Sequence, residues 1–419
     1  MAAGYAEMLR TRYAARLLTG TLVGRLPTAT ASLAIVLFVK SQDAGYALAG
    51  ALTAVYGIGN AVGQPLLGRA VDLYGQPRVM LPSAVLSALG MAVFAWVGLD
   101  PLPLAYAAVA IAGLFTPPLE GGLRALWPSV LGSEERIHAA YALDAVAQEV
   151  MYAVGPLIVM LLAAQWSPAA GLLVINVLGL LGALAVVTSP PSRGWRSEPR
   201  EAHWLGALRS RGLLVVLGAF FCIGSALGAI AVAAVAYAEN QGDKNISAWL
   251  LSALGVGALI GGVVYGHRQW AGEPERRLRL IVTALAVCYV PLVLVPGAIA
   301  MTLLAALAGV FLAPALACAF VVVDRHAPRG CATEAFSWLV TSFGVGASIG
   351  SAVAGPAIEW GSDAMGFAVS VAGGAAALLV LLATRHLLTA PKARVVAGNV
   401  PENDRTGAAE PGFSAGHQA

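Results

Sequence analysis

Long apolar stretches alternate along this chain with short charged, glycine-containing or proline-containing segments. Each stretch has about 20 residues or more, which is the length that an α-helix needs to cross a bilayer. The first six lie near residues 16–39, 45–68, 78–98, 102–127, 136–163 and 168–189. Six more lie near residues 209–237, 246–266, 278–296, 298–323, 333–358 and 364–387. The pattern predicts an all-α integral membrane protein with 12 transmembrane helices in two six-helix bundles.

Polar segments divide the predicted helices into two groups. We expect an N-terminal six-helix bundle over residues 1–190, a cytoplasmic linker over 191–207 and a C-terminal six-helix bundle over 208–390. From Pro391 onward the sequence becomes polar and loses its periodicity. Residues 391–419 are therefore predicted to form a disordered cytoplasmic tail.

An internal repeat relates the two groups of helices. Four glycines of the second predicted helix recur 198 positions later in the eighth: Gly57, Gly59, Gly63 and Gly68 correspond to Gly255, Gly257, Gly261 and Gly266. The pair Gly155-Pro156 recurs 200 positions later as Gly355-Pro356. Ordered matches at a nearly constant offset indicate a duplication. The halves have diverged, because Trp270 stands where Asp72 would map.

Composition agrees with a polytopic membrane protein. Hydrophobic residues make up 58% of the 419 residues, charged residues make up 11%, and the mean hydropathy is +0.77. Nearly every arginine falls in alternate loops, while Lys40 and Lys244 would lie on the opposite side. The positive-inside rule therefore predicts that both termini are cytoplasmic. Heavy use of arginine, alanine and glycine favours a bacterial source, and so the bacterial inner (cell) membrane.

Several other classes of function lack a sequence signal. No Gly-Lys-Ser/Thr phosphate loop, His-Glu-x-x-His zinc motif or exposed serine elbow is present, so we expect neither an enzyme nor a cofactor. Four cysteines without short paired spacing are interpreted as packing residues, not as metal ligands. The net charge of +3 gives no indication of nucleic acid. The expected partners are the lipid bilayer, a small-molecule substrate and protons, and we expect a monomer.

A short charged hairpin lies between the second and third predicted helices. Its distinctive residues are Gly68, Arg69, Asp72, Gly75 and Arg78. Their spacing resembles the loop between helices 2 and 3 of the major facilitator superfamily, although Gln76 and Pro77 stand where that family often carries basic or small residues. The resemblance implies that Asp72 lies near the start of a helix from the opposite half, where the helix dipole favours a carboxylate. These residues would form a conformational latch.

The resemblance to the major facilitator superfamily extends over about residues 10–390 and implies a fold and a mechanism. Two bundles would be related by a pseudo-two-fold axis along the membrane normal, with the substrate between them near the midplane. Access would alternate by rocking, and helices 1, 4, 7 and 10 would line the cavity. In this family an acid of helix 4 often joins the hairpin arginines, so Glu120 and its local partner Arg124 are added to the latch.

Four ionisable residues inside the predicted spans are the candidates for transport chemistry, because burying a charge in a bilayer costs several kcal/mol. They are Arg25, Glu120, Asp144 and Glu149. We expect Arg25 to face Asp144 and Glu149, leaving one carboxylate in excess. Glu149, the deepest, is predicted to carry the coupling proton. The alternative is a permanent buried pair that holds helix 1 to helix 5 while the substrate is handled elsewhere.

Proline positions predict bends in the helices. Gly155-Pro156 resembles the core of a motif that facilitator antiporters carry in helix 5, where proline bends the helix and glycine permits contact with the other half. Gly355-Pro356 is the equivalent pair in helix 11. Pro117-Pro118 is expected to kink helix 4 and free carbonyl groups toward a cavity.

Three hypotheses for the function follow. The first is a drug/proton antiporter-like permease that exports small organic compounds, either drug-like molecules or metabolites. The second is proton-coupled uptake of a small anionic nutrient held by Arg25. The third, a membrane-embedded enzyme, has no motif to support it.

Overall fold

A computed structural model describes residues 3–199, 203–243, 245–268, 270 and 272–388. Within these residues every regular element is helical. The first bundle contains α2 (Ala14–Lys40), α3 (Tyr46–Tyr74), α4 (Gln76–Val97), α5 (Leu102–Leu114), α6 (Leu119–Leu131), α7 (Glu134–Gln165) and α8 (Pro168–Val187). The short helix α1 (Ala3–Arg10) precedes it.

The second bundle repeats this order. It contains α10 (Arg211–Asn240), α11 (Asn245–His267), α12 (Pro274–Tyr289) with η2 (Val290–Leu294), α13 (Ala298–Gly309), α14 (Leu312–His326), α15 (Ala332–Trp360) and α16 (Asp363–Ala383). Between the bundles lie α9 (Pro190–Gly194) and η1 (Gly206–Arg209), and η3 (Arg385–Leu388) follows α16. Part of the predicted linker is therefore helical. The predicted tail, residues 391–419, lies outside the described residues.

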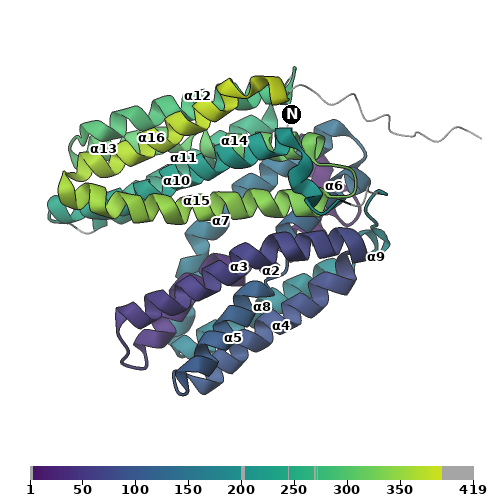
Figure 1. Cartoon of the computed structure of the whole chain (residues 1–419), viewed down its shortest axis with the longest axis horizontal. Helices are drawn as coiled ribbons and strands as arrows, with labels where there is room; N and C mark the ends of the chain where they lie inside the picture. Colours follow the sequence, from purple (N-terminus) through teal and green to yellow (C-terminus); the bar gives the residue numbers. More distant parts are fainter. Residues whose placement is uncertain (1–2, 200–202, 244, 269, 271, 389–419) are drawn as a thin grey trace, which may run out of the picture.

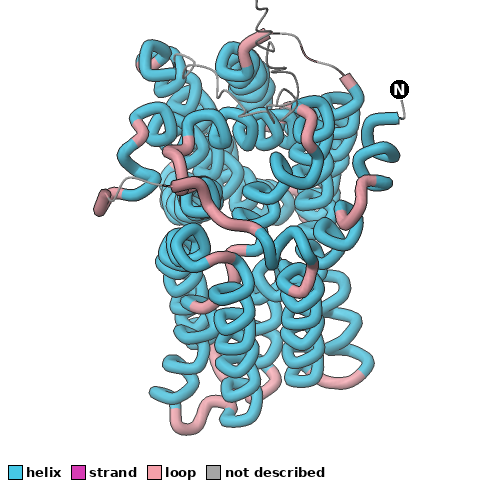
Figure 2. Tube along the Cα trace, turned by 90° about the vertical axis from the view of Figure 1, so that its right-hand side faces the viewer, coloured by secondary structure: helices cyan, strands magenta, loops and turns pink. Residues whose placement is uncertain are grey.

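The helices of both bundles run in roughly one direction and are joined by short loops (Figure 2). Among the described residues, 11 helical segments are long and apolar enough to cross a membrane. The twelfth long helix is α3, with 29 residues, whose hydropathy is lowered by glycines and by Asn60 and Gln64. Pairing α5 with α6 and α13 with α14 gives the arrangement of 12 spans expected for the fold.

The two bundles meet at one end of the molecule and diverge toward the other (Figure 1). We call the first end the hairpin end, because it carries α9, α6 and the turn between α3 and α4 (residues 74–76). Across the interface, α3 of the first bundle packs against α15 of the second, and α7 packs against α11 and α14. These contacts position the candidate site between the bundles.

Helix 4 of the sequence prediction is broken rather than kinked. Residues 115–118 separate α5 from α6, because Pro117 and Pro118 cannot donate backbone hydrogen bonds. The freed carbonyl of Thr116 accepts a hydrogen bond from Gln64 Nε2 at 3.1 Å. The break therefore places a satisfied backbone polar group beside α3, at membrane depth.

Close backbone packing follows the internal repeat. Gly63 of α3 lies against the Leu114 carbonyl of α5, and Gly261 of α11 lies against the Val310 carbonyl that follows α13. An added Cβ at either glycine would overlap the facing carbonyl oxygen. Two of the repeated pairs, Gly59 with Gly257 and Gly63 with Gly261, thus allow helix backbones to approach closely, as small residues do in membrane bundles.

Candidate functional site

A cavity of about 560 Å³ lies between the two bundles. Its walls come from α2, α3, α6 and α7 on one side and from α14 and α15 on the other. The expectation that helices 1, 4, 7 and 10 line the cavity is wrong for helix 7, because α10 contributes none of the lining residues. Gly224 of α10 packs against the Phe343 carbonyl of α15, so α15 presents one face to α10 and another to the cavity.

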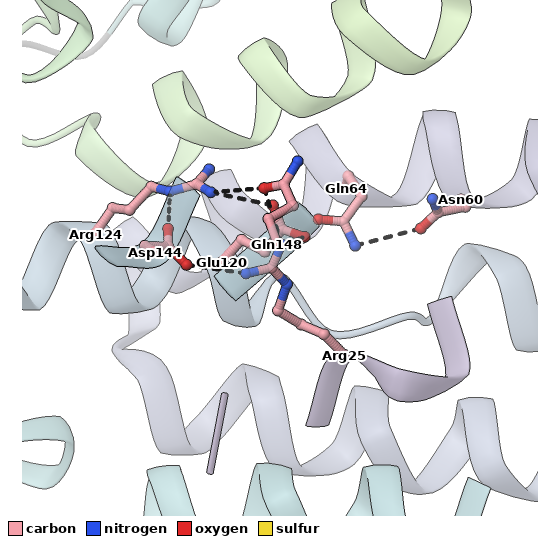
Figure 3. Close-up of polar contacts among 7 residues, drawn as sticks. All are labelled: Arg25, Asn60, Gln64, Glu120, Arg124, Asp144 and Gln148. Atoms are coloured by element: carbon pink, nitrogen blue, oxygen red, sulfur yellow. Dashed lines mark hydrogen bonds and ion pairs between the residues drawn. The ribbon is translucent and has the colours of Figure 1, made fainter. Parts of the chain in front are cut away.

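Two buried arginines converge on Asp144 at the wall of this cavity (Figure 3). Arg25 Nη1 lies 3.0 Å from Asp144 Oδ1, and Arg124 Nε lies 2.7 Å from Asp144 Oδ2. Asp144 and Arg124 are completely buried, and Arg25 is 3% exposed. Because α2, α6 and α7 each supply one of these residues, the carboxylate joins three helices of the first bundle.

Glu120 and Gln148 complete the cluster. Arg25 Nη2 lies 2.7 Å from Glu120 Oε1, and Arg124 Nη2 lies 3.5 Å from Glu120 Oε2. Gln148 Oε1 accepts from Arg25 at 3.0 Å and from Arg124 at 3.4 Å. Two positive and two negative groups therefore form one neutral network, which we call the charge cluster. Glu120, with a side chain 14% exposed, is its carboxylate that reaches the cavity.

The expected pairing of Arg25 with Glu149 is wrong. Residues four apart on an α-helix share a face, so Asp144 and Gln148 both point to Arg25, whereas Glu149 is turned by about 100° from Gln148. That places Glu149 near the face of α7 whose Val146 packs against Gly262 of α11. Glu149 is half-buried and makes no ion pair within the described part of the chain.

Arg124 also contacts the second bundle. Its guanidinium stacks 3.7 Å from the centroid of the Phe320 ring in α14, and 6.0 Å from the centroid of Phe336 in α15. Such cation–π contacts stabilise a desolvated guanidinium. The sequence alone predicted for Arg124 only a local pairing with Glu120, and it indicated neither Gln148 nor Phe320 as a partner. The i, i+4 spacing of Asp144 and Gln148 in an apolar helix was the available signal for Gln148.

The hairpin carboxylate lies at the start of a helix from the opposite bundle, where the resemblance placed it. Asp72 is 6% exposed and accepts the backbone N–H of Thr333 at 3.1 Å and of Glu334 at 2.9 Å. These are first-turn amides of α15, which have no partner within their own helix. Gly68 allows this approach, because an added Cβ there would lie 2.6 Å from Ser337 Oγ.

The hairpin arginines do not join Glu120, contrary to expectation. Arg69 donates instead to the carbonyl oxygens of Trp204 at 2.7 Å and His203 at 3.2 Å, in the segment that connects the bundles. Arg78 is exposed on α4. Gly75 ends α3 with a φ of 88°, a conformation that suits glycine. The charge cluster and the hairpin are therefore separate groups of residues, without an ion pair between the hairpin arginines and Glu120.

Gln76, which departs from the family pattern, holds the hairpin in place. Its side chain is fully buried, donates to the Gly122 carbonyl of α6 at 2.9 Å and accepts from Ser192 Oγ of α9 at 2.8 Å. One amide therefore ties together the hairpin, the second part of helix 4 and the linker. No feature of the sequence alone indicated this role.

The glycine–proline pairs lie inside uninterrupted helices. Pro156 lies within α7 and Pro356 within α15. Gly155 faces Thr30 of α2 in its own bundle, so the expected contact of Gly155 with the other half is wrong. Gly155 lies nine residues after Val146, which is two and a half helical turns, so the two residues lie on opposite faces of α7. Gly155 therefore points away from the second bundle. An added Cβ at Gly355 would meet open space.

Comparison with known proteins identifies this architecture. The family model described as the Major Facilitator Superfamily matches residues 17–351. The chain belongs to the major facilitator superfamily. It is therefore a multi-pass membrane protein of a transporter family. No curated protein sequence is significantly similar to this chain.

Solved structures share the major facilitator fold at low sequence identity. A bacterial homologue of the iron transporter ferroportin, in an outward-facing state, superimposes with a TM-score of 0.73 at 16% identity, covering 89% of this chain and 99% of that one. The E. coli fucose:proton symporter FucP gives 0.68 at 16% identity, covering 88% and 97%. The human organic anion transporter MFSD10 (TETRAN) gives 0.62 at 16% identity, covering 88% and 98%.

Proposed function

We propose that this major facilitator protein is a proton-coupled exporter of small organic compounds, working by alternating access in a bacterial inner membrane. The observation that carries the proposal is the charge cluster, which lies at the wall of the interbundle cavity and keeps one carboxylate, Glu120, in contact with that cavity. A buried ionisable network beside a substrate-sized cavity is the usual arrangement for coupling proton movement to transport.

The charge balance of the cluster explains how a proton would act. With Glu120 ionised, two arginines and two carboxylates cancel. Protonation of Glu120 leaves the cluster with one net positive charge in a low-dielectric setting, where an unbalanced charge is costly. Arg124 would transmit this change to the other bundle, because its guanidinium stacks on Phe320.

Glu149 stays a second candidate for the coupling proton. It is a half-buried carboxylate on α7, in a helix that contacts α11 and α14 of the other bundle. Rocking of the bundles would change its surroundings. We favour Glu120 because it contacts both arginines and the cavity, whereas Glu149 is not among the cavity-lining residues.

The distribution of arginines supports an orientation with the hairpin end in the cytoplasm. At that end two contacts hold the bundles together. Asp72 of α3 accepts a backbone hydrogen bond from the start of α15, and Arg124 of α6 stacks on Phe320 of α14. Because the bundles diverge toward the other end (Figure 1), we propose that this conformation is outward-facing, as in the ferroportin homologue. Asp72 would then act as the latch that releases when the bundles rock.

Uptake of an anionic nutrient has less support. Arg25, the cation expected to hold such a substrate, is engaged by Glu120, Asp144 and Gln148. An anion would have to displace a buried carboxylate to reach it, which is costly.

Transport in proteoliposomes under an imposed pH gradient tests the proposal. Glu120→Gln should abolish gradient-driven substrate movement while retaining substrate binding, because the amide keeps the shape and cannot exchange a proton. Glu149→Gln is the matched control on α7 and should retain coupling. If Glu149→Gln loses coupling and Glu120→Gln keeps it, Glu149 is the carrier. Full uphill transport by both variants would exclude side-chain proton coupling at either acid. Reversing the gradient distinguishes export from uptake.

A further inference from the structure

We propose that the interbundle cavity recognises an uncharged amphipathic substrate whose polar end carries hydroxyl or amide groups, held by the side-chain amides of Asn60, Gln64 and Gln148. The inference rests on the proposed transport function and narrows its substrate class. Three observations carry it: the charge balance of the cavity, the fixed orientation of the amides, and the apolar character of the opposite wall.

The cavity offers no uncompensated charge to a ligand. Glu120 and Arg124 are the charged side chains among its lining residues, and both belong to the neutral charge cluster. Arg124 is completely buried and also contacts Asp144 at 2.7 Å. A charged substrate would have to separate a buried ion pair to gain a partner, whereas an uncharged substrate leaves the cluster intact.

Hydrogen bonds fix which end of each amide is presented. Gln148 faces two arginines, which only donate, so its oxygen must accept from them and its NH2 group is directed elsewhere. Gln64 faces the Thr116 carbonyl, which only accepts, so its NH2 group is engaged there and its oxygen is left over. Neither the Gln148 NH2 group nor the Gln64 oxygen has a hydrogen-bond partner within the described residues.

Asn60 extends this pattern along α3. Its Oδ1 accepts from Gln64 Nε2 at 3.3 Å, which leaves its own NH2 group for a ligand (Figure 3). The wall therefore presents a donor at Asn60, an acceptor at Gln64 and a donor at Gln148. Arg124 adds a buried Nη1 that has no hydrogen-bond partner in the described part of the chain. Hydroxyl and amide groups can satisfy both donors and acceptors.

The opposite wall is mainly apolar, and its two hydroxyl groups, those of Thr341 and Ser348, donate to the carbonyls of Ala61 and Gly344. It is built from α14 and α15 by side chains that include Leu316, Phe320, Phe343, Val345 and Ile349. Transfer of apolar surface onto such a wall is favourable, at about 25 cal/mol per Å². A volume of about 560 Å³ lies within the range of small-molecule sites. A substrate with one polar edge and one apolar face matches the two walls.

Binding of three probes to the full-length protein in lipid nanodiscs tests this inference. The probes are phenyl β-D-glucopyranoside, which is uncharged, 2-phenylethylamine, a cation, and 3-phenylpropionate, an anion. The measurement is the probe concentration that gives half of the maximal thermal stabilisation. We expect the glucoside to give half-maximal stabilisation at a concentration at least about tenfold lower than that of either charged probe. Asn60→Leu and Gln64→Leu should each raise the glucoside value by about threefold to tenfold, as expected for one lost hydrogen bond.

Asn176→Leu is the matched control, because Asn176 is a buried amide of the same bundle that lies outside the cavity and bonds to the Leu172 carbonyl at 2.8 Å. This variant should leave unchanged the glucoside concentration that gives half-maximal stabilisation. The inference is overturned if a charged probe binds as tightly as the glucoside, if no probe binds, or if Asn176→Leu weakens binding as much as Gln64→Leu. Gradient-driven transport of the amine that depends on Glu120 would overturn this inference and leave the transport proposal standing.

Discussion

The two bundles of this protein share the backbone packing of their helices, but they differ in their buried charged residues. Gly63 and Gly261 occupy equivalent positions and bring equivalent helix backbones into contact, at α5 in the first bundle and beside α13 in the second. The first bundle also contains four charged side chains in one buried cluster. In the second bundle α10 and α15 are packed together through glycines, with Gly224 on the Phe343 carbonyl and Gly350 on the Ser225 carbonyl.

This difference shows what a duplication preserves. Backbone contacts at glycine tolerate no side chain, so the positions that build the scaffold stay recognisable in both halves. Charged residues inside a membrane are costly and persist where they have a function. The first bundle therefore supplies the polar wall and the charge cluster, and the second supplies the apolar wall against which they work.

The largest expected effect comes from breaking the charge cluster. Arg25→Ala removes the 2.7 Å contact to Glu120 and the 3.0 Å contact to Asp144, leaving buried carboxylates with one arginine. Removing one partner of a buried ion pair costs about 3–5 kcal/mol. Thermal unfolding of purified protein should show this loss. A second change, Glu120→Gln, should restore part of the stability, because it removes the excess charge.

Glu149→Gln in the Arg25→Ala background is the control for this experiment. Because Glu149 makes no ion pair with Arg25, it should restore nothing. Equal recovery from Glu120→Gln and Glu149→Gln would contradict the arrangement of the cluster.

The shared scaffold predicts equal effects in the two bundles. Gly63→Val and Gly261→Val should each destabilise by about 1–3 kcal/mol or more, because each new side chain overlaps a backbone carbonyl. Gly255→Val is the control, since an added Cβ at that glycine meets open space. Unfolding midpoints of the three variants give the comparison. A large loss for one glycine of the pair and none for the other would show that the scaffold is not equivalent.

Substitution of the hairpin residue Asp72 should change the stability less than the changes above, but it should reduce transport. Asp72→Asn keeps the shape of the side chain but weakens the charge–dipole contact with α15, worth about 0.3–2 kcal/mol. Transport should fall sharply at normal membrane abundance. Arg78→Gln, at an exposed position of the same hairpin, should transport normally. Full transport by Asp72→Asn would count against a latch.

The smallest effect is expected at the hairpin end of the second bundle. Glu275 lies 3.3 Å from the partly exposed Arg325 and 3.2 Å from His326. Glu275 is buried, but the amide of Glu275→Gln can keep the hydrogen bond to His326 and the partly exposed Arg325 can turn to solvent. Stability should therefore fall by no more than about 1 kcal/mol, as for one weakened hydrogen bond. Transport rates should stay at the parent level. A loss of transport comparable with that of Asp72→Asn would show that the start of α12 also controls the conformation.

Much of the fold was accessible from the sequence because bilayer thickness fixes the length of a spanning helix. Long apolar runs therefore predicted the spans, and the repeat of glycines predicted two related bundles. The break at Pro117-Pro118 was underestimated as a kink, because two consecutive residues without a donor end a helix rather than bend it.

The candidate site was accessible only in part. The sequence determined which ionisable residues lie within the spans, since Arg25, Glu120, Asp144 and Glu149 interrupt apolar runs. It did not determine which of them pair. Helix periodicity fixes which residues of one helix share a face, as for Asp144 and Gln148, but not how that helix is rotated against its neighbours.

Tertiary packing determined which of these ionisable residues pair. Rotation of α7 turned Asp144 toward both arginines and placed Glu149 outside the ion pairs. Packing of α6 against α15, and of α7 against α14, brought Arg124 onto Phe320. The sequence thus determined where charge is buried, because apolar length is a local property. Only the tertiary structure decided which charges neutralise one another, because that depends on contacts between helices far apart in the chain.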